Sequence, residues 1–147
     1  MLLAEHNAKW GAQRSPTEQV HCNTLGYGEF SQYDPRCAAC WLGHYHTWED
    51  HDRSVRAAVA SEERHARVNG LTVHRVNVLA DGEVVGEYLN HTGDLDKAIA
   101  QAVELIRGGV QVAAHVWSGS VFLAEVTTDH NGNPTVERQA GGDPQVW

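Results

Sequence analysis

Long apolar runs and charged clusters are both scarce in this chain of 147 residues. No stretch approaches the ~20 consecutive apolar residues that a membrane span needs, and the opening MLLAEHNAKW has too short an apolar run for a secretory signal. The hydrophobic fraction of 41% and the charged fraction of 20% are typical of a folded globular protein. We therefore expect a soluble, cytoplasmic protein without a membrane partner.

Positive charge is also scarce. The chain has 11 Lys and Arg residues against 19 Asp and Glu residues, a net charge of −8. The excess of acid is greatest after residue 70. Contacts with nucleic-acid phosphates need clustered Lys and Arg, so this balance argues against a nucleic-acid partner. A protein partner is the expectation, with a homodimer through an exposed sheet edge as a further possibility.

Cysteine is confined to one short stretch, VHCNTLGYGEFSQYDPRCAACWLGHYH, residues 20–46. An odd number of cysteines leaves one thiol over in a full disulfide framework, and clustered cysteines in a reducing cytosol are more often metal ligands or redox groups. A redox pair at Cys37 and Cys40 and inert, packed thiols are the two alternatives. The three histidines among these cysteines favour a bound zinc ion.

The spacing of these residues predicts a ligand set. Asp34 is a good N-cap and Pro35 suits a first helical position, which predicts a helix from Asp34. On that helix the two CxxC thiols lie one turn apart, and the next turn brings a histidine to the same face. A fourth ligand comes from the preceding segment and completes a structural Cys₃His site. The predicted ligands are Cys22, Cys37, Cys40 and His44, with His21 or His46 as alternatives to His44.

This stretch resembles the treble-clef zinc fingers. In that pattern a C-x-x-C-G knuckle precedes a short hairpin, and a helix then carries CxxC in its first turn. Here CNTLG stands at the knuckle with Leu25 in place of the second cysteine, GYGEF stands at the hairpin, and CAAC supplies the helical pair. The resemblance covers residues 20–50. It implies a zinc-binding fold element and no particular activity.

The chain changes character near Asn69-Gly70, so we predict three segments, 1–69, 70–139 and a tail at 140–147. The second segment predicts a ββαβββ order. Asp81-Gly82 is a strong hairpin signal, and Asp94 precedes an apolar helical stripe that Gly108-Gly109 ends. The predicted fold class is α+β, a zinc-stapled, helix-containing first half followed by an antiparallel sheet with one helix.

The first segment is less regular. LLAEHNAKWGAQ predicts a short helix. A second start at Thr47, followed three residues later by Asp50, resembles a capping box and predicts a helix to about Val68, with a break near His46-Thr47. On that helix one apolar side is formed by Trp48, Val55, Val59 and Ala66.

Two other functions use residues of this segment. A metal-dependent nuclease or hydrolase would use the cluster His46, Asp50 and His51. A zinc module that binds nucleic acid would use arginines on one helical face: Arg36, Arg53, Arg56, Arg64 and Arg67. Acidic residues alternate with these arginines, so the face suits an acidic protein partner equally well. The reading we favour is a small zinc-binding protein that acts as a non-enzymatic interaction or regulatory module.

Overall fold

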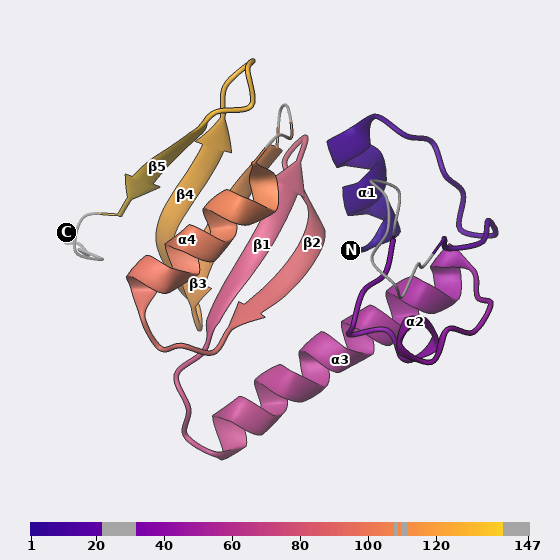
Figure 1. Cartoon of the computed structure of the whole chain (residues 1–147). Coiled ribbons are helices and arrows are strands. Elements are labelled where there is room, and N and C mark those ends of the chain that lie inside the picture. The colour runs from indigo at the N-terminus through magenta and orange to yellow at the C-terminus, as the bar shows by residue number, and fades with distance from the viewer. Residues whose placement is uncertain (22–31, 108, 110–111, 140–147) are drawn as a thin grey trace.

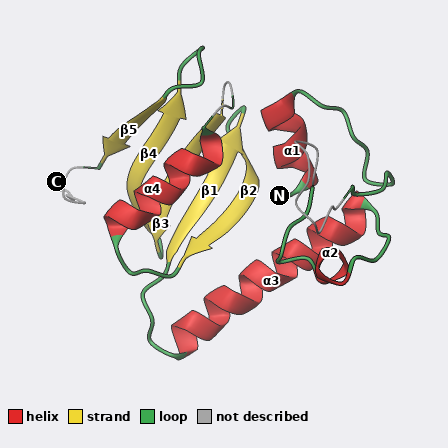
Figure 2. Cartoon of the chain, viewed as in Figure 1, coloured by secondary structure: helices red, strands yellow, loops and turns green. Residues whose placement is uncertain are grey.

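The computed structural model describes residues 1–21, 32–107, 109 and 112–139. Helices occupy the first half and an antiparallel sheet with one helix occupies the second (Figures 1 and 2). This mixture agrees with the α+β prediction. The elements are α1 (Leu3–Trp10), α2 (Ala38–Leu42), α3 (Trp48–Val68), β1 (His74–Ala80), β2 (Glu83–Asn90), α4 (Leu95–Ile106), β3 (Val112–Ser118), β4 (Val121–Thr128) and β5 (Pro134–Arg138). No helix in the described part of the chain is long and apolar enough to cross a membrane.

The five strands form one sheet in the order β2-β1-β3-β4-β5, and every neighbouring pair is antiparallel. Asp81 and Gly82 join β1 to β2 with φ angles of 52° and 79°. This two-residue turn with positive φ matches the right-handed twist of the strands that it joins. The predicted hairpin at Asp81-Gly82 is therefore confirmed.

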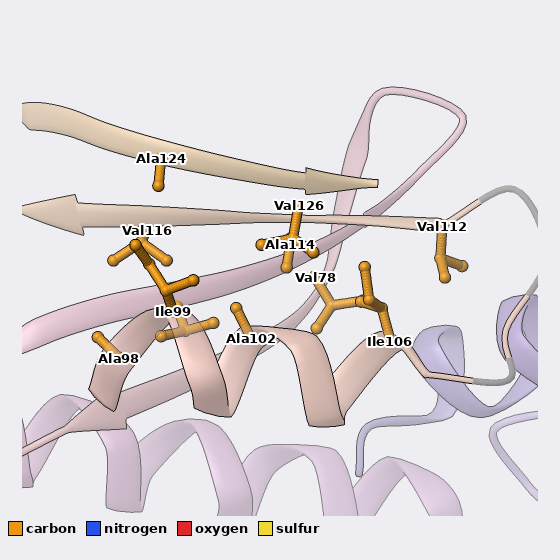
Figure 3. Packing of buried hydrophobic residues seen from close by; sticks show 11 residues of the cluster. Val78, Ala98, Ile99, Ala102, Ile106, Val112, Ala114, Val116, Ala124 and Val126 are labelled. Carbon is orange, nitrogen blue, oxygen red and sulfur yellow. The ribbon is translucent and has the colours of Figure 1, made fainter. Parts of the chain in front are cut away.

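Helix α4 covers one face of this sheet (Figure 1). Asp94 caps the helix by accepting hydrogen bonds from the backbone N–H groups of Asp96 and Lys97. Figure 3 shows Ile99, Ala102 and Ile106 pointing toward the strands, where they meet valine and alanine side chains. The strand residues of this buried cluster are Val76, Val78, Val112, Ala114, Val116, Ala124 and Val126.

The N-terminal helices enclose a second, smaller cluster. Trp48 and Val55 line the inner side of α3, where they pack with Leu2, Leu3 and Val20. Two further members of this cluster are the thiol side chains of Cys37 and Cys40. The helix start predicted at Thr47 is confirmed, because α3 begins at Trp48 and Thr47 accepts a hydrogen bond from the Asp50 N–H. The break itself begins earlier than the predicted His46-Thr47, because α2 already ends at Gly43.

Polar contacts join the helical half to strand β2. Glu5 of α1 is 1% exposed and accepts a 2.7 Å hydrogen bond from the Tyr88 hydroxyl. The absence of a side chain at Gly86 leaves room for Glu5, since a Cβ there would lie 2.3 Å from the carboxylate. Burial raises the pKa of Glu5 above its ordinary value, and the Tyr88 hydrogen bond opposes that rise. Arg36 donates to the Glu87 carbonyl at 2.7 Å and stacks on the Tyr88 ring.

Candidate metal centre

Four buried side chains converge between α2 and α3. The ligand atoms of Cys37, Cys40, His46 and His51 all lie within 4.8 Å of one another. Three of these residues are fully buried and His46 is 5% exposed. Two thiols and two imidazoles within this distance could hold a metal ion.

Short-range backbone geometry places the four residues. Cys37 is the N-cap of α2, and Cys40 lies within that single turn of helix. Gly43, with a φ of 72°, ends α2 in the left-handed conformation and reverses the chain toward His46. His51 lies in the first turns of α3, on the same inner side as Trp48 and Val55.

Four of the six distances within the cluster match those around a tetrahedral zinc ion. The His46 Nε2 atom lies 3.5 Å from the Cys37 sulfur and 3.4 Å from the Cys40 sulfur, and His51 Nδ1 lies 3.5 Å from the Cys40 sulfur. The two ring nitrogens are 3.4 Å apart. Zinc bonds of about 2.3 Å to sulfur and about 2.0–2.1 Å to nitrogen would separate tetrahedral ligands by about 3.5 Å (S to N) and about 3.3–3.4 Å (N to N).

Hydrogen bonds on the far side of each ring fix which nitrogen carries the proton. His46 Nδ1 lies 2.8 Å from the His44 carbonyl, and His51 Nε2 lies 2.8 Å from the Met1 carbonyl. A carbonyl oxygen only accepts, so these two nitrogens donate. In the neutral imidazoles, the nitrogens that face each other across the cluster therefore both present lone pairs. Two facing lone pairs cannot hydrogen bond to each other, whereas a cation between them satisfies both.

Burial and nearby charges set the protonation of groups in and beside the cluster. Burial lowers the pKa of His51 to about 4, so its imidazole is neutral at neutral pH, the form that binds metals. Asp34 lies one turn before Cys37 and binds the Arg36 guanidinium at 2.8 Å. Burial would raise the pKa of Asp34, but the hydrogen bonds and charge of Arg36 hold it well below its usual range.

The structure brings some of the predicted residues together and leaves others outside. Cys37 and Cys40 belong to the cluster, and so does His46, the alternative to His44. The His44 side chain is exposed and outside the four-residue group, although its backbone carbonyl binds His46. His21 is also exposed. Cys22, like the knuckle and hairpin of the treble-clef resemblance, lies outside the described residues.

The helix predicted to begin at Asp34 instead begins at Ala38. Asp34 caps a turn, because its carboxylate accepts from the Arg36 N–H and its carbonyl accepts from the Cys37 N–H. Gly43 then ends α2 before His44, so no continuous helix places His44 above Cys40. The two thiols lie close together because the turn capped by Asp34 leads directly into α2, which is itself a single helical turn.

His51 is the member of this cluster that the sequence indicated only for a possible catalytic site. Its position three residues after Trp48 and four before Val55 places it on the buried stripe of α3, where a histidine needs a partner. That spacing is the feature of the sequence from which the burial of His51 could have been predicted. The third member of the predicted cluster, Asp50, is exposed and binds Arg53 at 2.9 Å. Four predicted arginines, Arg53, Arg56, Arg64 and Arg67, are exposed along α3.

Comparison with known protein families, curated proteins and solved structures finds no match to this chain.

Proposed function

We propose that the cluster of Cys37, Cys40, His46 and His51 binds one zinc ion and that this ion is structural. The observation that carries the proposal is the convergence of four buried ligand atoms within 4.8 Å, four of whose six separations are those of a tetrahedral zinc site. Thiolate and imidazole ligands select zinc over magnesium, calcium and manganese, which prefer oxygen.

Four protein ligands favour a structural role over a catalytic one. A catalytic zinc keeps a position for water or substrate, whereas a structural zinc is closed by four protein side chains. The burial of Cys37, Cys40 and His51 also keeps solvent away from the proposed ion. The nuclease alternative is therefore less well supported, because Asp50, its third ligand, binds Arg53 instead.

The function that fits a closed metal site is recognition of another molecule by the surface that the metal organises. We propose a non-enzymatic interaction module with a protein partner. The net charge of −8 supports this choice over nucleic acid. Arg53 of α3 is already paired with Glu49 and Asp50, which reduces the positive charge that this helix offers to nucleic acid.

Metal analysis of purified protein tests the zinc site. The wild type, prepared without chelating resin or added metal, is expected to contain about one zinc per chain. Cys40→Ser and His51→Asn should each lose it, while His44→Ala, which replaces a predicted ligand outside the four-residue cluster, and Cys22→Ser should retain it. Cobalt substitution gives a second readout, because tetrahedral cobalt with thiolate ligands absorbs visible light.

Absence of metal from the wild type, with thiols that react freely, would contradict the proposal. Loss of zinc from His44→Ala or Cys22→Ser, with zinc retained in His51→Asn, would instead support the ligand set predicted from the sequence.

A further inference from the structure

Helix α3 carries charged side chains in two different states. All of its carboxylates already have a partner: Glu49 and Asp50 bind Arg53, Asp52 accepts from the Leu3 N–H, Glu62 lies 3.2 Å from His91 Nε2, and Glu63 binds Arg75 at 2.6 Å. The helix also carries Arg56, Arg64 and Arg67, whose side chains form no hydrogen bond or ion pair within the described part of the chain. The helix therefore presents unpaired positive charge on a chain whose net charge is −8.

These three arginines share one side of α3. At about 100° per residue, Arg56 and Arg67 point within about 20° of each other, and Arg64 points about 60° from Arg67. All three are exposed, whereas Val59 and Ala66 lie on the buried side of the helix. Arg56 and Arg67 are separated by about 16 Å along the helix axis. We call the three residues the arginine row.

The dipole of the helix explains only part of this row. The carbonyl end of a helix attracts cations within its last turn, which accounts for Arg67 but not for Arg56 or Arg64. The charge of Arg56 opposes the rise in the pKa of Asp52 that burial causes, but no ion pair joins these two side chains. The arginine row therefore carries positive charge that the fold itself does not use.

A cavity opens at one end of the arginine row. It has a volume of about 360 Å³ and lies between the last turns of α3, the linker to β1 and the turn between β3 and β4. Arg67 lines the cavity beside Leu71 and Val73, and Leu71 is 60% exposed. Glu63 also lines it, but this carboxylate is already bound to Arg75. The cavity thus combines apolar side chains with an unpaired guanidinium.

Charge and chemistry distinguish a nucleic acid from an acidic protein segment at this surface. A nucleic acid carries phosphates along its whole length, so it gains from the three arginines but meets the repulsion of a chain with a net charge of −8. It also has no aliphatic side chain for the cavity. A short acidic segment of a protein can place carboxylates opposite the arginines alone and an apolar side chain beside Leu71.

A second copy of this chain is a poorer occupant. It has the same net charge, and most of the carboxylates in its described sheet half are already bound by cationic side chains, by His115 or by backbone N–H groups. The bound carboxylates are those of Glu87, Asp94, Asp96, Glu104, Glu125 and Asp129. A carboxylate that already has a partner gains little from a further guanidinium.

We propose that the arginine row binds a short acidic segment of a partner protein and that the cavity at Arg67 receives an apolar side chain of the same segment. This inference rests on the proposed function as an interaction module, whose partner it describes, and it does not require the zinc ion. Each guanidinium can bind a carboxylate through two parallel N–H donors. About five extended residues are enough to follow the row, so the recognised segment is short.

The experiment titrates the full chain against a fluorescein-labelled peptide of alternating glutamate and serine with a leucine near each end. Fluorescence anisotropy at low salt measures the affinity. The comparison probes are the same peptide with alanine in place of leucine and single-stranded DNA of equal charge. The comparison proteins are Arg56→Gln/Arg64→Gln, Leu71→Ser and Arg107→Gln/Arg138→Gln. The last variant makes the same change in net charge at exposed arginines of the sheet half.

The expected result is an affinity for the leucine peptide that falls about fivefold or more in Arg56→Gln/Arg64→Gln and much less in Arg107→Gln/Arg138→Gln. Rising salt should weaken binding. Leu71→Ser should bind the leucine peptide no better than the alanine peptide, because it removes an apolar contact in the cavity.

Three results overturn the proposal. The first is that the wild type does not bind the peptide, or that Arg56→Gln/Arg64→Gln binds it equally well. The second is that the DNA binds as tightly as the peptide and depends on the same arginines. The third is a dimer in sedimentation that Arg56→Gln/Arg64→Gln dissociates, which would make a second copy the occupant.

Zinc content, measured on every sample, separates failure of this inference from failure of the proposed zinc site. A wild type that contains zinc but does not bind the peptide removes this inference alone. A wild type that binds the peptide through the arginine row but contains no zinc removes the zinc site alone.

Discussion

The two buried clusters of this protein differ in what they bury. The cluster beneath α4 consists of aliphatic side chains only. The cluster beneath α3 includes two thiols, and the same region also buries Glu5, Asp34, His46 and His51. Burying apolar surface stabilises a fold without any further component, whereas a buried polar group is costly until it has a partner. We therefore expect the stability of the helical half to depend more than that of the sheet half on what its buried polar groups bind.

Removing the proposed metal should give the largest difference in hydrogen-exchange protection between the helical half and the sheet half. Zinc sites in small domains contribute about 10–16 kcal/mol of apparent binding free energy, and the apo forms unfold. We expect a strong chelator to release the backbone amides of α2 and the start of α3 to hydrogen exchange, while β1, β3 and β4 stay protected. Addition of zinc should restore protection. Uniform loss of protection throughout the chain would show that the two regions do not differ in this way.

Truncating a side chain of the aliphatic cluster should destabilise the sheet half. Ile106 is fully buried between α4 and the sheet. Ile106→Ala is expected to lower the free energy of unfolding by about 2–5 kcal/mol, because it removes buried methyl groups and leaves a cavity. Urea denaturation of zinc-loaded protein measures the change, and zinc content should remain that of the wild type. Val68→Ala, at an exposed site, is the control and should change stability little.

The contact between the two regions should depend on pH through Glu5. Burial raises the pKa of this carboxyl in the folded protein, so the folded state binds its proton more tightly than the unfolded state does. Stability from this group is full below the ordinary pKa of 4.5 and is lost as pH rises through the raised folded value. Glu5→Gln should remove the loss of stability between the ordinary pKa and the raised folded pKa of Glu5. The stability of this variant relative to wild type should therefore increase with pH.

Tyr88→Phe gives the matching test of the same contact. Loss of the Tyr88 hydroxyl removes the 2.7 Å hydrogen bond to Glu5 and leaves the carboxyl without that donor. A decrease of about 1–3 kcal/mol in the free energy of unfolding is expected. Thermal melts of both variants between pH 4 and pH 8 would check this. Parallel profiles for wild type and Glu5→Gln would exclude Glu5 as the titrating group.

The smallest expected effect concerns the cap of α4. Asp94 accepts hydrogen bonds from two N–H groups at the start of this helix. Asp94→Ala should cost about 1 kcal/mol, whereas Asp94→Asn keeps a capping oxygen and should cost much less. Denaturation midpoints of the two variants measure the difference. If the two variants were equally destabilised, charge rather than capping would be the contribution of Asp94.

The sheet half was predictable because its signals are local and repetitive. The stripe of Leu95, Ile99, Ala102 and Ile106 indicates the helix, and the alternation in β3 indicates which residues face it. Asp81-Gly82 fixes the hairpin turn. Each of these patterns repeats with the period of the element that forms it, so a short window of sequence is sufficient.

The candidate metal centre was only partly predictable because its four residues do not share one element. Cys37 and Cys40 have a recognisable spacing, but the position of the histidines depends on where α2 ends. Gly43 ends it one residue before His44, which the expectation of a continuous helix did not allow for. His51 belongs to α3. It lies close to the two thiols only because the chain leaves α2 at Gly43 and then enters a second helix.

The local spacing of the four cluster residues also bears on the order of folding. All of them occur between residues 37 and 51, whereas the contacts that attach this segment to the rest of the chain are distant: His51 to the Met1 carbonyl spans 50 residues and Arg36 to the Glu87 carbonyl spans 51. Closing a short loop is faster and loses less entropy than closing a long one. We therefore expect the four-residue cluster to assemble early, as a nucleus onto which the N-terminal segment and the edge of the sheet later dock.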